Sequence, residues 1–193
     1  MLGVGSSSGV RVVVGMWADS PFGAFADAMV EDHRGHRILV APSAQVAQFV
    51  AQTYAFDETR VEPFHAERTP HTLEVVSSSL TLNAVVAGRT PLGRLLRGIP
   101  PPVGAHPAFA TAVDPIARLV LRGVRTRGTA RAGRREWYAA RDHHRVTSLT
   151  GRWDGVDLGR LAPVDPPTRF GFSSTPRTPA LTAVTTTIQL EMT

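Results

Sequence analysis

The sequence contains no cysteine and no lysine, and these two absences exclude several kinds of chemistry. Because none of the 193 residues is a cysteine, the chain has no disulfides, no thiolate nucleophile and no cysteine-ligated metal centre. Arginine supplies all 21 of the residues counted as lysine plus arginine. No lysine side chain is therefore present to form a Schiff base, to anchor pyridoxal phosphate or to hold nucleotide phosphates in a P-loop.

The chain also has few aromatic residues, no long basic run and no long apolar run. Its net charge of +5 would suit nucleic acid, but acidic residues are interleaved with the arginines and aromatic residues make up only 7%. We therefore disfavour nucleic acid as a partner. The valine-rich run near the N-terminus is too short to cross a membrane, so we expect a cytoplasmic protein that does not bind membranes.

Short apolar segments separated by glycine and proline predict a mainly β fold within one domain, residues 1–193. We expect an α+β protein with an antiparallel barrel-like or sandwich sheet and two or three short helices. Helices are predicted at 43–54 and 90–97, where Ser43 and Thr90 are suitable N-caps, and at 106–121 with a break at Pro115. Glycine and serine at 1–8 predict a flexible N-terminus. The predicted strands are 11–17, 25–31, 36–41, 57–67, 71–87, 124–130, 135–142, 146–153, 169–173 and 183–190.

Residues 133–144 hold the densest mixture of charged, aromatic and imidazole side chains in the chain. Strict alternation along a strand would separate these side chains onto two faces. One face would carry Glu136, Tyr138, Ala140, Asp142 and His144, and the other Arg135, Trp137, Ala139, Arg141, His143 and the following Arg145. Two interpretations stay open: a solvated strand with charge pairs and Trp137 packed inward, or a half-buried strand that lines a ligand cavity.

Candidate site residues come from this stretch and from two arginines before it. Glu136 and His143 are the candidate acid/base pair, and the ligand-binding candidates are Arg118, Arg125, Tyr138, Arg141 and Asp142. Arg118 lies four residues after Asp114, a spacing that suits a helical ion pair. Alternatively, Arg118 and Arg125 offer guanidinium groups to a carboxylate. The histidine spacing supplies no closed metal site, and we expect no cofactor.

Two stretches resemble acetoacetate decarboxylase-like proteins. Gly133-Arg134-Arg135-Glu136-Trp137-Tyr138 is similar to a Gly-Arg-Glu-containing strand of that family, and Phe22-Gly23-Ala24-Phe25-Ala26-Asp27-Ala28 is similar to its Gly-Pro-Tyr-x-Glu strand. The resemblance implies a β-barrel-like core around a cavity with Glu136 nearby. The family's Schiff-base lysine would fall near Asp142, so the resemblance implies no imine chemistry here.

Three functions follow as hypotheses. The first is a small-molecule-binding domain for an anionic ligand, a carboxylate or an acyl compound. The second is a cofactor-free hydrolase or lyase that uses Glu136 or His143 as acid/base. The third is a protein-interaction module that uses arginine-rich strands. Whether the chain forms a homo-oligomer is left open.

Overall fold

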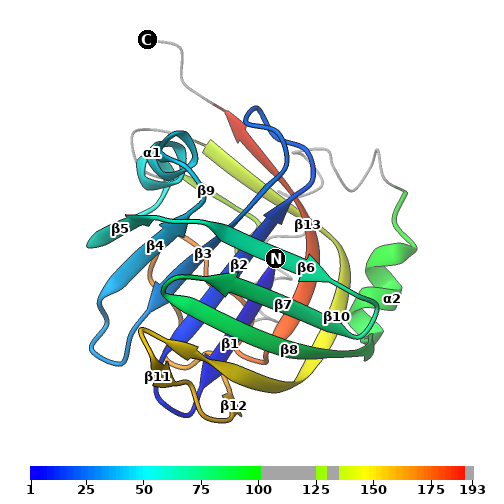
Figure 1. The fold of residues 1–193 in the computed structure, drawn as a ribbon. Helices are drawn as coiled ribbons and strands as arrows, with labels where there is room; N and C mark the ends of the chain where they lie inside the picture. The colour runs from blue at the N-terminus through cyan, green and yellow to red at the C-terminus, as the bar shows by residue number, and fades with distance from the viewer. Residues whose placement is uncertain (101–124, 130–134, 190–193) are drawn as a thin grey trace.

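The computed structural model describes residues 1–100, 125–129 and 135–189. These residues form a mainly β structure in which one curled, mostly antiparallel sheet makes a half-barrel (Figure 1). Two short helices lie beside the sheet in this part of the chain. The predicted fold class is confirmed.

The strands follow one another through most of the chain. They are β1 (Leu2–Ser6), β2 (Arg11–Trp17), β3 (Phe25–Glu31), β4 (Arg37–Ala41), β5 (Glu58–Val61), β6 (Phe64–Arg68), β7 (Thr72–Ser77), β8 (Leu80–Arg89), β9 (Arg127–Thr129), β10 (Arg135–Trp153), β11 (Val156–Asp157), β12 (Leu161–Ala162) and β13 (Ala180–Gln189). The helices are α1 (Ala44–Thr53) and α2 (Pro91–Arg97). The sheet order is β5-β4-β3-β2-β1-β13-β10-β8-β7-β6, with β12 beside β1 and both β9 and β11 beside β10. Among the described pairs only β4 and β5 run parallel.

The two faces of the curled sheet have different roles because side chains alternate along each strand. On β2, Val12 and Val14 point into the main core, where they pack with buried residues of β1, β3, β4, β7, β8, β10 and β13. Their neighbours Val13 and Gly15 point to the other face, which borders a cavity. Helix α1 packs against β4 through a second, smaller core around Leu39.

The N-terminus is a central strand, so the prediction of a flexible segment at 1–8 was wrong. Strand β1 lies between β2 and β13, and the side chains of Leu2 and Val4 are fully buried. A Cβ atom at Gly3 would lie 2.6 Å from Cβ of Thr175, and one at Gly5 would overlap the backbone carbonyl of Pro163. The glycines therefore permit close packing of the segment 163–179 on β1.

Both helix caps that the sequence predicts are confirmed. Val46 N donates to the Ser43 hydroxyl at the start of α1, and Gly93 N donates to the Thr90 hydroxyl at the start of α2. The third predicted helix, 106–121, lies outside the described residues.

Several strand boundaries differ from those predicted. The segments 57–67 and 71–87 each form two strands, interrupted at Pro63, which has no backbone N–H to donate, and at the turn around Ser77. The segments 135–142 and 146–153 join into the single strand β10. Residues 169–173 lie in a loop, not in the predicted strand.

Candidate functional site

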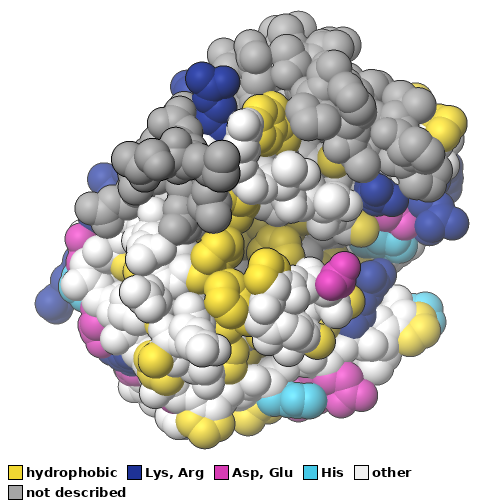
Figure 2. All heavy atoms as spheres, turned by 90° about the horizontal axis from the view of Figure 1, so that it is seen from above, with side chains coloured by type: hydrophobic (Ala, Val, Ile, Leu, Met, Phe, Trp, Pro, Cys, Tyr) yellow, Lys and Arg dark blue, Asp and Glu magenta, His cyan; other side chains and the backbone are white. Residues whose placement is uncertain are grey.

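A cavity of about 530 Å³ lies between the sheet, the two helices and the loop 168–176. Its walls come mainly from β2, β3, α1, α2, β10 and β13, and most of the lining is apolar. Seen from above, the middle of this side of the molecule is hollowed and hydrophobic side chains gather there (Figure 2). The apolar and aromatic lining residues include Val13, Trp17, Phe22, Phe25, Met29, Phe49, Val50, Leu92, Leu96, Phe170, Val184 and Ile188.

An irregularity in β10 determines which side chains reach the cavity. The register between β10 and β13 shifts between Ala140 and Asp142, so Arg141 is the extra residue of a β-bulge. After the bulge, His143 comes onto the same face as Tyr138 and Ala140, and all three line the cavity. The predicted division into two alternating faces is therefore correct before the bulge and wrong after it.

Glu136 and two tyrosines form a buried polar cluster beside the cavity. The Tyr54 hydroxyl, at the end of α1, and the Tyr138 hydroxyl donate to the Glu136 carboxylate at 3.2 and 2.9 Å, and the two hydroxyls are 2.7 Å apart. Glu136 is fully buried, whereas both tyrosines line the cavity. Burial raises the pKa of both phenols well above 10, and the neighbouring Glu136 raises them further. Both tyrosines therefore stay protonated and act as hydrogen-bond donors.

Tyr138 is held in place by an aromatic neighbour. Its ring stacks on Phe172, with 5.4 Å between centroids and 16° between planes. Gly128 of β9 permits this arrangement, because a Cβ atom there would overlap the Phe172 ring. The position of the Tyr138 hydroxyl is thus set by stacking as well as by hydrogen bonding, which favours a preformed site.

His143 lines the cavity and has one ring nitrogen without a hydrogen-bond partner among the described residues. Its side chain is buried and its Nδ1 lies 2.9 Å from the Thr90 hydroxyl, whereas its Nε2 is buried and no described residue forms a hydrogen bond with it. The Thr90 hydroxyl also lies 3.2 Å from the His143 carbonyl oxygen. The tautomer that satisfies both contacts has the proton on Nδ1, so Nε2 is a hydrogen-bond acceptor. Burial lowers the pKa of His143 and nearby His144 lowers it further, which favours this neutral form.

Asp27 is an ionisable cavity residue that the sequence analysis missed. It is 2% exposed, and its Oδ1 accepts a hydrogen bond of 2.9 Å from the Trp17 indole. Burial raises the pKa of Asp27 to about 6, although the indole hydrogen bond opposes this shift. The signal was present in the sequence: Asp27 stands in an apolar strand and shares a face with Phe25 and Met29. Gly15, its partner on β2, leaves room for the carboxylate.

The remaining candidates fall in different places. Arg125 is exposed and lines the cavity, with its backbone N–H donating to the Ser173 hydroxyl. Arg141 is half-buried and is not a lining residue. Asp142 accepts two hydrogen bonds of 2.7 and 2.9 Å from Arg89, which lower its pKa to about 2, and it does not line the cavity either. Arg118 lies outside the described residues.

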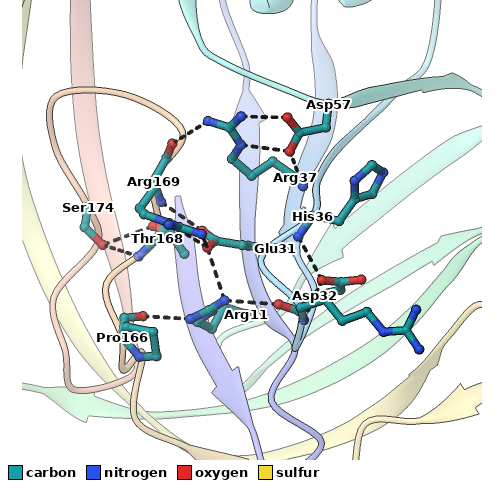
Figure 3. A network of polar contacts seen from close by, with 11 residues as sticks. Arg11, Glu31, Asp32, His36, Arg37, Asp57, Pro166, Thr168, Arg169 and Ser174 are labelled. Atoms are coloured by element: carbon teal, nitrogen blue, oxygen red, sulfur yellow. Dashed lines mark hydrogen bonds and ion pairs between the residues drawn. The ribbon is translucent and has the colours of Figure 1, made fainter.

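A buried ionic network fixes the loop that forms one wall of the cavity (Figure 3). Glu31, fully buried at the end of β3, lies 3.2 Å from the Arg11 guanidinium and accepts hydrogen bonds from the backbone and the side chain of Arg169. Arg11 also donates to the carbonyl oxygen of Pro166. The network therefore joins β2 and β3 to the loop that supplies Thr168 and Phe170 to the cavity.

No family model, no curated protein and no solved structure matches this chain. The resemblance to acetoacetate decarboxylase-like proteins therefore stays a prediction. The described residues contain no group of histidine, aspartate and glutamate side chains arranged to hold a metal ion. Neither helix of the described part is long and apolar enough to cross a membrane.

Proposed function

We propose that the protein binds a small molecule with a largely apolar body in the cavity of the half-barrel. The observation that carries this proposal is the cavity itself: about 530 Å³ in volume, with mostly apolar walls and a few polar groups that converge on it. Ligand-binding pockets usually have this size and composition. The preformed positions of Tyr138 and His143 support binding further, because less ordering is needed when a ligand enters.

The carboxylate or acyl group expected for the ligand would lie near Arg125. This residue is the one arginine among the described lining residues, and it is exposed, so an anionic group would stay close to solvent. Deeper in the cavity a carboxylate would meet Asp27, whose charge would repel it. We therefore expect the apolar body of such a ligand to point inward and its carboxylate to pair with the Arg125 guanidinium.

Calorimetric titration with 4-phenylbutyrate tests this proposal. We expect saturable binding by the wild-type protein, weakened at least threefold in Arg125→Ala. Arg141→Ala is the matched control, because it removes the same charge from a side chain outside the cavity and should leave the affinity unchanged. Ala140→Phe should abolish binding by filling the cavity. Binding that survives Ala140→Phe, or no binding of any apolar probe, would contradict the proposal.

A second candidate function is acid/base catalysis without a cofactor, as a hydrolase or lyase. His143 favours it, because this cavity-lining imidazole is neutral and its Nε2 has no hydrogen-bond partner in the described part of the chain, which suits it to accept a proton. Glu136 is less suited to this role, because both tyrosine hydroxyls donate to its carboxylate and it does not line the cavity. If this function holds, turnover of an ester or carbonyl substrate should be lost in His143→Gln and kept in Glu74→Gln, a change in an exposed strand residue.

A further inference from the structure

We infer that the buried part of the cavity, around Asp27, is a binding site for the ammonium group of an aromatic or aliphatic amine. This inference rests on the proposed function, because it requires that the same cavity binds small molecules. It adds the chemical class of the group that enters most deeply. Three features carry it: an oriented carboxylate with an unused oxygen, a group of aromatic rings around the same space, and the charges that face it.

The Asp27 carboxylate is oriented by one hydrogen bond and keeps one oxygen for a ligand. Its Oδ1 accepts from Trp17, whereas no described residue donates a hydrogen bond to its Oδ2. No described arginine pairs with it, unlike Glu31, Asp57 and Asp142, which each have an arginine partner. Asp27 is nevertheless 2% exposed and lines the cavity. A buried carboxylate without a cationic partner is costly, and a ligand cation would remove that cost.

Aromatic rings surround the same part of the cavity. Trp17 and Phe25 have centroids 6.2 Å apart, Phe22 lies 6.5 Å from Phe25, and Phe22 lies 5.1 Å from Phe49. All four side chains line the cavity together with Asp27. The faces of aromatic rings attract cations, most strongly where water is excluded. Aromatic rings beside one carboxylate therefore suit an ammonium group attached to an apolar body.

The other titratable groups near this site do not replace the cation. The Met1 α-amino group donates to the Thr182 carbonyl oxygen at 2.9 Å, and its pKa is lowered to about 6, chiefly by burial. Tyr54 and Tyr138 stay neutral, and His143 has a lowered pKa. At pH 7.5 the negative charge of Asp27 is thus not balanced by these neighbours. The lining residues Asp19 and Arg125 have opposite charges and are both exposed, so solvent screens them.

The test compares three ligands with one apolar body: 4-phenylbutylamine, 4-phenylbutanol and 4-phenylbutyrate. Calorimetric titration at pH 7.5 should show the amine binding at least tenfold more tightly than the alcohol. Asp27→Asn should remove this advantage and leave the affinity for the alcohol within about twofold. Asp19→Asn is the matched control, since it neutralises an exposed carboxylate of the same cavity, and it should keep most of the advantage.

The outcomes separate this inference from the proposed function. If the alcohol binds as tightly as the amine, the ammonium site is wrong while the small-molecule cavity stands. If none of the three ligands binds, both proposals fail.

A measurement on the wild-type protein covers the case in which Asp27→Asn does not fold. The advantage of the amine over the alcohol should shrink as pH falls from 7.5 to 5, because Asp27 becomes protonated while the amine stays charged. Control titrations of Asp19→Asn over the same range should show the same decrease. A constant advantage across this range would overturn the inference.

Discussion

Replacing Glu31 with glutamine tests how strongly the buried ionic network stabilises the fold. Glu31 is fully buried and Arg11 has a side chain that is 6% exposed, so the substitution leaves a buried guanidinium without its carboxylate. Removing one partner of a buried ion pair usually costs about 3–5 kcal/mol. Arg11 keeps its hydrogen bonds to the carbonyl oxygens of Pro166 and Asp32, and Arg169 is 68% exposed. We therefore expect a loss near the lower limit, about 3 kcal/mol.

Urea unfolding followed by circular dichroism measures this loss. The midpoint should fall while the slope of unfolding free energy against urea stays the same, because the change in exposed surface is unaltered. Glu74→Gln makes the same chemical change at an exposed position of β7 and should alter the free energy of unfolding by less than about 0.5 kcal/mol. A loss below about 1 kcal/mol for Glu31→Gln would refute the reasoning, because Arg11 would then not depend on this carboxylate.

Three further predictions follow from local features. Gly3→Ala should destabilise the protein by about 1–3 kcal/mol in the same urea assay, because its Cβ would lie 2.6 Å from Cβ of Thr175. Gly88→Ala is the control, because no atom lies within 4 Å of the new Cβ. Asp27 has a raised pKa of about 6, so the folded state binds more protons than the unfolded state from about pH 4 to 6 and its stability falls as pH rises through that range. Asp27→Asn should lack this decrease in melting curves recorded from pH 4 to 7. If the melting temperatures of wild type and Asp27→Asn differ by the same amount at every pH, the raised pKa of Asp27 is contradicted. Treatment with EDTA should leave the melting temperature unchanged; a large decrease would reveal a structural metal.

Local patterns in the sequence were enough to predict the class of fold and several of its elements. Strands β2 and β3 and helices α1 and α2 appear close to their predicted positions. Their signals act between neighbours: β-branched residues favour extended backbone, and the hydroxyls of Ser43 and Thr90 satisfy N–H groups a few residues away. Such signals do not depend on how distant parts of the chain pair.

Features that depend on distant parts of the chain were missed or misplaced. Glycine in β1 indicates flexibility when only neighbours are considered, yet Gly3 and Gly5 permit contact with a loop near residue 170. The bulge at Arg141 exists because of pairing with β13, and one extra residue was enough to move His143 onto the cavity side.

The sequence by itself determined the mainly β character of the protein, the positions of its caps and the chemistry that it lacks. Only the tertiary structure decided which polar side chains share a cavity. Tyr54 and Glu136 are 82 residues apart in the chain, yet their side chains are hydrogen-bonded. The sequence shows Asp27 within an apolar strand, but only the fold places it in the same cavity as residues of α1 and of the loop 168–176. The physical reason is range: hydrogen bonding and side-chain alternation act over a few residues, whereas burial, and with it the pKa of a carboxyl group, depends on everything that packs around it.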